Sequence, residues 1–174
     1  MFQAARENFI RSQAAYSLVS YILQVKDRHN GNIMIDKEKG YLVHIDFGFI
    51  LETSPANNLR FERAPFKLTD EMIRIMGGTT KSEPFQLYLT LVIKGFLLAR
   101  RYHRHIENMV NLMVRSGLPC FLPKALENLE ERFFLKLSEI EAAEEMKELV
   151  LSAADHWTTN WYDRIQWMQQ KIYH

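Results

Sequence analysis

A short polar segment constrains the fold of this chain more than any other stretch. Residues 26–32 read KDRHNGN, and six of these seven residues are polar or charged. They follow SLVSYILQV, the end of an apolar pattern that predicts a helix over residues 4–25. They precede IMID, which has the pattern of a strand. A cluster of acid, base and amide side chains between two packed elements predicts a loop with a chemical role.

A β-hairpin is predicted directly after this loop. The runs NIMID and YLVHID flank the charged turn KEKG, in which Gly40 can adopt a positive φ. Beyond the second run, residues 49–68 lose their periodicity and are interrupted by Ser-Pro, Asn-Asn and Ala-Pro pairs. A structureless loop of this length is unusual in a compact domain, and such loops are usually functional or mobile.

Residues 69–174 are predicted to be almost wholly helical. Thr69 can cap the helix that follows it, and Ser138 with Glu141 forms a capping-box pattern. The segment 85–99 is apolar on nearly every side, which predicts a helix buried at the centre of a lobe. The expected fold is therefore mainly α with one small β-hairpin, in a single domain.

Composition limits the binding partners and the cellular location that can be expected for this chain. The formal net charge of +1 gives no support to a nucleic-acid partner. Cys120 is the single cysteine, so no internal disulfide can form, and a cytoplasmic location is the default. The segment 85–99 is shorter than the roughly 20 residues of a membrane span and contains Lys94, so any membrane contact is expected to be peripheral.

Several apolar residues of the helical part are interpreted as core. Cys120 is read as a small buried hydrophobe, and four methionines at helical spacing are read as core residues: Met72, Met76, Met109 and Met113. Near the C-terminus, Trp157 and Trp161 begin an apolar helical stripe. Two interpretations of the stripe stay open, packing against the lobe and contact with a membrane surface.

The spacing of three polar residues indicates phosphoryl transfer. Asn32 offers an amide oxygen and Asp46 a carboxylate, and the hairpin joins them so that both can point at one Mg²⁺ ion. An attacking hydroxyl needs a proton acceptor, and Asp27 and His29 are both near enough in sequence to serve. The Asp-x₄-Asn spacing followed by Asp-Phe-Gly is the arrangement of protein kinases. His44 either orients this site or, as the simpler interpretation, is a hydrogen-bonded structural histidine.

The same motifs resemble a specific family. KDRHNGNIMID with HIDFGFI resembles the phosphatidylinositol 3-/4-kinase superfamily. The stretches ARENFIRSQAAYSLVSYILQ, APFKLTDEMIRIMGG, SGLPCF and YDRIQ are similar to the type III alpha phosphatidylinositol 4-kinases, and the likeness covers essentially the whole chain. It implies a protein-kinase-like C-terminal lobe over residues 1–174, with a catalytic loop at 26–32, Asp-Phe-Gly at 46–48, an activation loop at 49–68 and a helical part at 69–174.

This resemblance implies a reaction and a role for each residue of the motifs. ATP with Mg²⁺ would donate its γ-phosphoryl group to the 4-hydroxyl of phosphatidylinositol. Asp27 and His29 would be the catalytic pair, Arg28 would anchor their loop, and Asn32 and Asp46 would bind ATP through the metal.

The resemblance also assigns substrate recognition to the activation loop. Arg60, Arg63 and Lys67 would bind the inositol head group. The loop also carries Glu52 and Glu62, and this mixture of charges suits phosphatidylinositol itself, whose head group has a single phosphodiester.

The family also has parts that this sequence lacks. No glycine-rich phosphate loop and no strand lysine precede the catalytic loop. The expected partners are therefore an N-terminal lobe in cis, phosphatidylinositol in a membrane and regulatory scaffold proteins, with a peripheral location at the plasma membrane. Two alternatives stay open: a TOR-like Ser/Thr protein kinase lobe and a catalytically inactive C-lobe that binds a partner.

Overall fold

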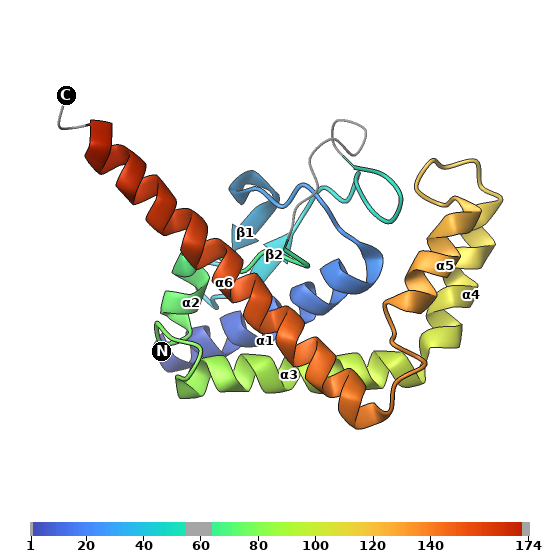
Figure 1. The fold of residues 1–174 in the computed structure, drawn as a ribbon, viewed down its shortest axis with the longest axis horizontal. Helices are drawn as coiled ribbons and strands as arrows, with labels where there is room; N and C mark the ends of the chain where they lie inside the picture. The colour runs from blue at the N-terminus through green and yellow to red at the C-terminus, as the bar shows by residue number, and fades with distance from the viewer. Residues whose placement is uncertain (1, 55–63, 172–174) are drawn as a thin grey trace.

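The computed structural model describes residues 2–54 and 64–171, and from residue 156 onward it describes only the course of the helix. It is mainly helical with one two-stranded antiparallel sheet, as the sequence predicts (Figure 1). The elements in chain order are α1 (Phe2–Leu23), η1 (Asn30–Asn32), β1 (Ile33–Ile35), β2 (Leu42–His44), α2 (Asp70–Ile75), α3 (Glu83–Arg101), α4 (His103–Val114), α5 (Pro123–Glu131) and α6 (Glu139–Lys171).

The hairpin forms where the sequence predicts it. Ile33 pairs with His44 and Ile35 with Leu42. Gly40 has φ +78°, and a Cβ at this position would lie 2.6 Å from the carbonyl oxygen of Ala5. Only glycine combines this backbone conformation with so close an approach to α1. The hairpin turn therefore packs closely against α1. This contact holds the hairpin beside the loop of residues 26–32.

The core lies where α1, α3 and α6 cross. The largest fully buried side chains in the described part include Tyr88, Phe85 and Phe96 of α3. Met146 and Val150 of α6 cover them with no exposed surface of their own. Figure 1 shows α3 along the lower edge of the molecule, with α1 and α6 running over it. This packing fixes the end of α1, from which the polar loop departs.

The prediction that residues 85–99 are buried on all sides is wrong. The helix α3 has an exposed face that carries Leu87, Thr90 and Lys94, and Leu98 is 56% exposed. Apolar residues cover most of the helix circumference, but neighbouring helices cover only one side. A hydrophobic side chain on the surface is common, because folded proteins cannot cover all of their surface with polar atoms.

A buried polar chain connects the core to the segment after the hairpin. Ser17 and Tyr88 share a hydrogen bond of 2.8 Å between their hydroxyl groups. Gln13, which is buried, donates from Nε2 to Ser17 Oγ at 3.3 Å and to the carbonyl oxygen of Lys67 at 2.9 Å. Burial raises the pKa of Tyr88, so the phenol stays protonated. The chain at Lys67 is thereby held against α1.

Both predicted helix caps are present. The hydroxyl of Thr69 accepts from Met72 N at 3.4 Å, at the start of α2. At the start of α6, Ser138 N donates to Glu141 Oε2 at 2.8 Å, and Glu141 N donates to Ser138 Oγ at 3.3 Å. This reciprocal pair is the capping box that the sequence predicts.

Three interpretations of core residues are corrected by the structure. Met72 and Met76 are buried as expected, but Met109 is 69% exposed and Met113 is also on the surface. Cys120 is partly exposed rather than buried. These residues lie on or just after α4, whose outer face no described element covers. Helical spacing alone does not distinguish a stripe facing a core from one facing outward.

The C-terminal part is one continuous helix, α6. The side chains of Trp157 and Trp161 lie outside the described residues. Over the described residues, no helix is both long enough and apolar enough to cross a bilayer.

Candidate active site

The two aspartates of the motifs have unusual backbones. Asp27 has φ +60° and Asp46 has φ +57°, in the left-handed region. Aspartate tolerates this region better than most residues, but the conformation still costs free energy and is retained where the surrounding structure enforces it. Such residues cluster at functional sites. Gln24, Leu51 and Phe134 also have a positive φ, so this conformation agrees with a functional role for the two aspartates but does not single them out.

Arg28 is the residue that connects the two motifs. Its side chain is buried, and Nε donates to the carbonyl oxygen of Lys26 at 2.9 Å. Nη1 donates to the carbonyl oxygen of Ile45 at 2.8 Å, and Nη2 donates to that of Asp46. The guanidinium also lies over the ring of Phe47, at 5.5 Å from its centroid. One planar cation therefore ties residues 26–28 to the start of the Asp-Phe-Gly motif.

Asn32 and the chain before Asp46 are joined in the same way. Asn32 is buried and donates from Nδ2 to the carbonyl oxygen of Asp27 at 2.8 Å, while Ile45 N donates to the carbonyl oxygen of Asn32 at 3.0 Å. The carboxylate of Asp46 is exposed and accepts from Gly48 N at 3.3 Å. A Cβ on Gly48 would lie 3.3 Å from Asp46 Oδ1, so glycine leaves this carboxylate room.

Asp27 and His29 face one another across the loop. His29 Nε2 lies 4.0 Å from Asp27 Oδ2. His29 Nδ1 accepts a hydrogen bond of 3.1 Å from Gly31 N, which places the proton of a neutral ring on Nε2, toward the carboxylate. The Cβ of any larger residue at Gly31 would lie 3.0 Å from this ring. Gly31 therefore permits the turn that orients His29.

His44 does not fit the interpretation of a hydrogen-bonded structural histidine. It is buried and stacks on Tyr16, with ring centroids 4.0 Å apart and planes 5° from parallel. Neither ring nitrogen has a hydrogen-bond partner among the described residues. Burial, together with the charges of Arg28 and Lys67, lowers the pKa of His44 from 6.5 to about 4. His44 is therefore neutral at physiological pH.

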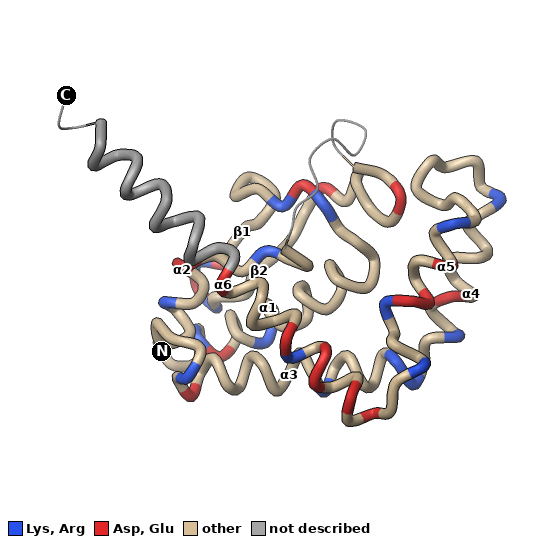
Figure 2. Tube along the Cα trace, viewed as in Figure 1, with Lys and Arg blue, Asp and Glu red and all other residues tan. Residues whose placement is uncertain are grey.

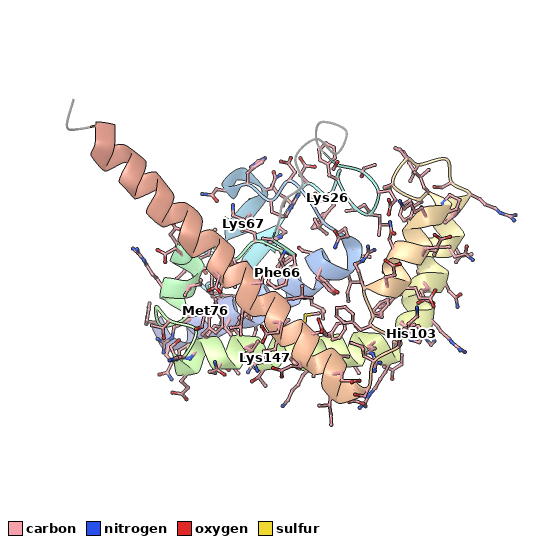
Figure 3. All side chains as sticks on the ribbon, in the orientation of Figure 1. Lys26, Phe66, Lys67, Met76, His103 and Lys147 are labelled. Atoms are coloured by element: carbon pink, nitrogen blue, oxygen red, sulfur yellow. The ribbon has the colours of Figure 1, made fainter. Side chains whose placement is uncertain are left out.

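Of the three basic residues predicted in the activation loop, only Lys67 lies in the described part; Arg60 and Arg63 lie outside it. Lys67 Nζ donates to Asn30 Oδ1 at 2.8 Å, so its side chain reaches the loop of residues 26–32 (Figure 3).

A cavity of about 870 Å³ adjoins the loop of residues 26–32 and is lined partly by residues that the sequence did not single out. Asp27 lines it together with Lys26, Glu52 and residues of α5. Lys26 Nζ donates to the carbonyl oxygens of Leu51 and Thr53 at 2.5 and 2.9 Å. From α5, Asn128 Nδ2 donates to Glu52 Oε1 at 2.7 Å.

Lys26 and Asn128 thus hold the start of the segment after β2 from two sides. Lys26 could have been suspected from its place beside Asp27. The sequence carries no signal for Asn128, which is separated from Glu52 by 76 positions.

Comparison with known proteins identifies the class to which this fold and this pair of motifs belong. The family model "Phosphatidylinositol 3- and 4-kinase" matches residues 1–122, which is more than half of the chain. The chain therefore belongs to the phosphatidylinositol 3- and 4-kinase family, and the resemblance drawn from the motifs is confirmed.

Individual relatives are phosphatidylinositol 4-kinases by name. Phosphatidylinositol 4-kinase alpha 2 of Arabidopsis thaliana is 48% identical over 174 residues, covering 98% of this chain and 33% of the relative. Phosphatidylinositol 4-kinase stt4 of Schizosaccharomyces pombe is 49% identical over 166 residues, covering 95% and 9%. Phosphatidylinositol 4-kinase beta 2 of Arabidopsis thaliana is 44% identical over 170 residues, covering 95% and 15%. The chain thus spans a third or less of the length of these relatives.

Proposed function

We propose that this chain forms the catalytic-loop half of a lipid kinase that transfers the γ-phosphoryl group of ATP to the 4-hydroxyl of phosphatidylinositol. The observation that carries the proposal is the buried guanidinium of Arg28, which holds the loop of Asp27 and the backbone of Asp46 together. Phosphoryl transfer depends mainly on positioning and charge stabilisation, so a rigid connection between base and metal ligand is the feature that this chemistry needs.

The oxygen donors of the site fit a divalent metal bound with ATP, which we take to be Mg²⁺. Among the described residues, no three His, Cys, Asp or Glu side chains gather to hold a metal by themselves. Mg²⁺ is usually held by one or two protein oxygens together with phosphate and water, and Asn32 Oδ1 with the Asp46 carboxylate supplies that number. When bound, the ion would neutralise charge on the phosphate oxygens.

The hydrogen bonds of His29 favour Asp27 as the proton acceptor. With Nδ1 accepting from Gly31 N, the neutral imidazole of His29 has its proton on Nε2 and cannot accept another there. The carboxylate of Asp27 would take the proton of the attacking inositol hydroxyl. His29 would then donate a hydrogen bond from Nε2 to the same carboxylate or to a phosphate oxygen. Arg28 has a structural role in this scheme.

An N-terminal lobe is needed to complete the ATP site, and the hairpin offers a surface for it. Met34 and Val43 are paired and face the same side, and both are exposed. Tyr41 and Ile45, which flank β2 and alternate with its buried residues, are also exposed. An apolar sheet face beside Asp46 supports a covering lobe in cis rather than a free surface.

Recognition of the head group would involve the segment after β2, with Lys67 at its described end and Arg60 and Arg63 outside the described residues. The substrate would be presented by a membrane, with the plasma membrane as the proposed location and scaffold proteins as regulators. These points rest on the names of the relatives and on the family resemblance.

The experiment that tests the proposal compares lipid with peptide substrates. The chain is joined to the N-terminal lobe of a relative's catalytic domain and supplied with labelled ATP and either phosphatidylinositol vesicles or Ser/Thr peptides. We expect label in phosphatidylinositol 4-phosphate, with the ring position read from the deacylated product. Label in peptide alone would favour the protein-kinase alternative. ATP binding without transfer to either substrate would favour the binding module.

A further inference from the structure

The turn between α4 and α5 has a composition unlike the rest of the surface. Residues 109–124 read MVNLMVRSGLPCFLPK and include no Asp or Glu, and their only charges are Arg115 and Lys124. Figure 2 shows this turn with blue segments and no red ones. We call the following set the α4–α5 tip: Leu112, Arg115, Leu118, Leu122 and Lys124.

The leucines of the α4–α5 tip are exposed although the helices that carry them are packed. Val110 of α4 is buried on the side toward α5, and Leu112 lies roughly 200° around the helix from it. Leu112 is 80% exposed, and Leu118 and Leu122 are 49% and 50% exposed. Packing of α4 against α5 therefore leaves most of Leu112 and about half of Leu118 and Leu122 uncovered. A cluster of exposed leucines at a projecting turn marks a contact surface.

The charges of the α4–α5 tip indicate what the surface contacts. Within the described part of the chain, neither the Arg115 guanidinium nor the Lys124 ammonium forms a hydrogen bond or ion pair. Arg101, by contrast, is paired with Glu139 at 3.0 Å, and what distinguishes the α4–α5 tip is that its cations stand in a stretch without acids. Unpaired cations beside exposed apolar side chains complement an anionic lipid surface, where the cations meet phosphate groups and the leucines enter the acyl boundary.

The position of the α4–α5 tip relates this surface to the candidate active site. Lys124 lines the same cavity as Asp27 and Glu52. In Figure 1 the turn between α4 and α5 and the segment after β2 project toward the same edge of the molecule. A bilayer that touches the α4–α5 tip would therefore bring lipid head groups to the cavity that Asp27 lines.

We propose that the α4–α5 tip docks this chain on an anionic bilayer, with Leu118 and Leu122 at the acyl boundary and Arg115 and Lys124 among the phosphates. This inference adds a docking surface to the proposed lipid-kinase function and is measured without turnover. A second copy of the chain or another protein segment could also cover exposed leucines. Residues 109–124 contain no acidic side chain, and the cations Arg115 and Lys124 form no ion pair among the described residues. An anionic lipid surface fits this charge distribution better than the other two occupants do.

Vesicle sedimentation of the full chain tests the proposal. The vesicles contain phosphatidylcholine, with or without about a third phosphatidylserine. We expect binding to the anionic vesicles, and a loss of about tenfold in partitioning for Leu118→Ser combined with Leu122→Ser. Lys124→Ala should weaken binding to anionic vesicles and leave the weak binding to neutral vesicles unchanged. The matched controls are Ile140→Ser, an apolar residue that is 83% exposed at the start of α6, and Lys136→Ala.

A second measurement does not depend on how the variants fold. Cys120 is the only cysteine and lies within the turn, so a nitroxide attached to it reports local depth. We expect the label to become accessible to oxygen and protected from a water-soluble nickel complex when anionic vesicles are added. Three results would each overturn the proposal. The label could remain exposed to water, or Ile140→Ser could lose as much vesicle binding as the Leu118→Ser, Leu122→Ser variant. That double variant could also change its oligomeric state while its vesicle sedimentation stays the same. Asp46→Asn should leave sedimentation unaltered, so failure of the docking surface is distinguishable from failure of the kinase function.

Discussion

Arg28 donates a hydrogen bond from Nη2 to the carbonyl oxygen of Asp46, and this contact joins the loop of residues 26–32 to the Asp-Phe-Gly motif. The same guanidinium holds the carbonyl oxygens of Lys26 and Ile45. Within the Asp27-Arg28-His29 motif, the central arginine therefore has a structural role. Asp27 and Asp46, whose chain segments this connection joins, both have a positive φ.

Replacing Arg28 with Lys should destabilise the chain. An ammonium keeps the charge but cannot donate to three carbonyl oxygens in one plane, so at least two partly buried acceptors lose their partner. We expect a loss of about 2–4 kcal/mol in the free energy of unfolding, measured by urea denaturation. Arg104→Lys, on the exposed side of α4, is the control and should change stability by less than about 0.5 kcal/mol. Equal stability of the two variants would contradict the anchoring role.

His44 should make stability depend on pH between 7 and 5. Its pKa is 6.5 when unfolded and about 4 when folded, so the unfolded chain binds a proton first as the pH falls. Its contribution is complete above pH 6.5 and is lost as the pH falls toward 4. We expect this histidine to remove about 1–2 kcal/mol of stability from pH 7 to pH 5.

The variant His44→Phe isolates the contribution of His44 to the pH dependence of stability, because it keeps a ring on Tyr16 and removes the titrating nitrogens. Urea denaturation of both proteins at the two pH values gives the comparison. The wild-type chain should lose more stability than the variant between pH 7 and pH 5. An identical pH dependence in the two proteins would show that His44 titrates alike in the folded and unfolded states.

Two glycines with the same backbone conformation should respond differently to alanine. Gly40 and Gly117 have φ +78° and +80°, but a Cβ at Gly40 would meet the backbone of Ala5, whereas one at Gly117 would have nothing within 4 Å. Gly117→Ala should cost about 1 kcal/mol from backbone strain alone. Gly40→Ala should cost about 2–4 kcal/mol, because the hairpin turn must also move away from α1. Thermal denaturation compares them, and equal losses would mean that the turn does not rest on α1.

Glu52 and Asn128 should be energetically coupled. Their hydrogen bond of 2.7 Å is a side-chain contact between α5 and the segment after β2. A double-mutant cycle with Glu52→Ala and Asn128→Ala should give a coupling energy of about 1 kcal/mol. Asn111→Ala on the exposed side of α4 provides the control and should add to Glu52→Ala without coupling. If the changes in unfolding free energy are additive in both cycles, α5 does not stabilise the segment after β2.

Local patterns predicted the elements that local chemistry specifies. The hairpin turn at Gly40, the cap at Thr69 and the capping box of Ser138 and Glu141 each depend on residues within a few positions, and all three are present. The spacing of Asp27, Asn32 and Asp46 likewise indicated a shared site, because a short hairpin brings its two ends together.

Features that depend on contacts between residues distant in sequence could not be predicted from local sequence patterns. Whether an apolar helical face is covered depends on which element packs against it, so Met109 and Leu98 could not be distinguished from core residues by periodicity. The bond from Asn128 to Glu52 and the stacking of His44 on Tyr16 likewise arise only once helices and hairpin are packed together.

The most direct test of the central claim is the turnover of Asp46→Asn, in the chain completed with a relative's N-terminal lobe. Asparagine keeps the shape of the side chain and its acceptor for Gly48 N but removes the carboxylate charge. Phosphate transfer from labelled ATP to phosphatidylinositol should fall by at least about 1,000-fold, with unchanged thermal stability. Turnover within about tenfold of the wild type would contradict the assignment of Asp46 as a metal ligand and, with it, the phosphoryl-transfer site described here.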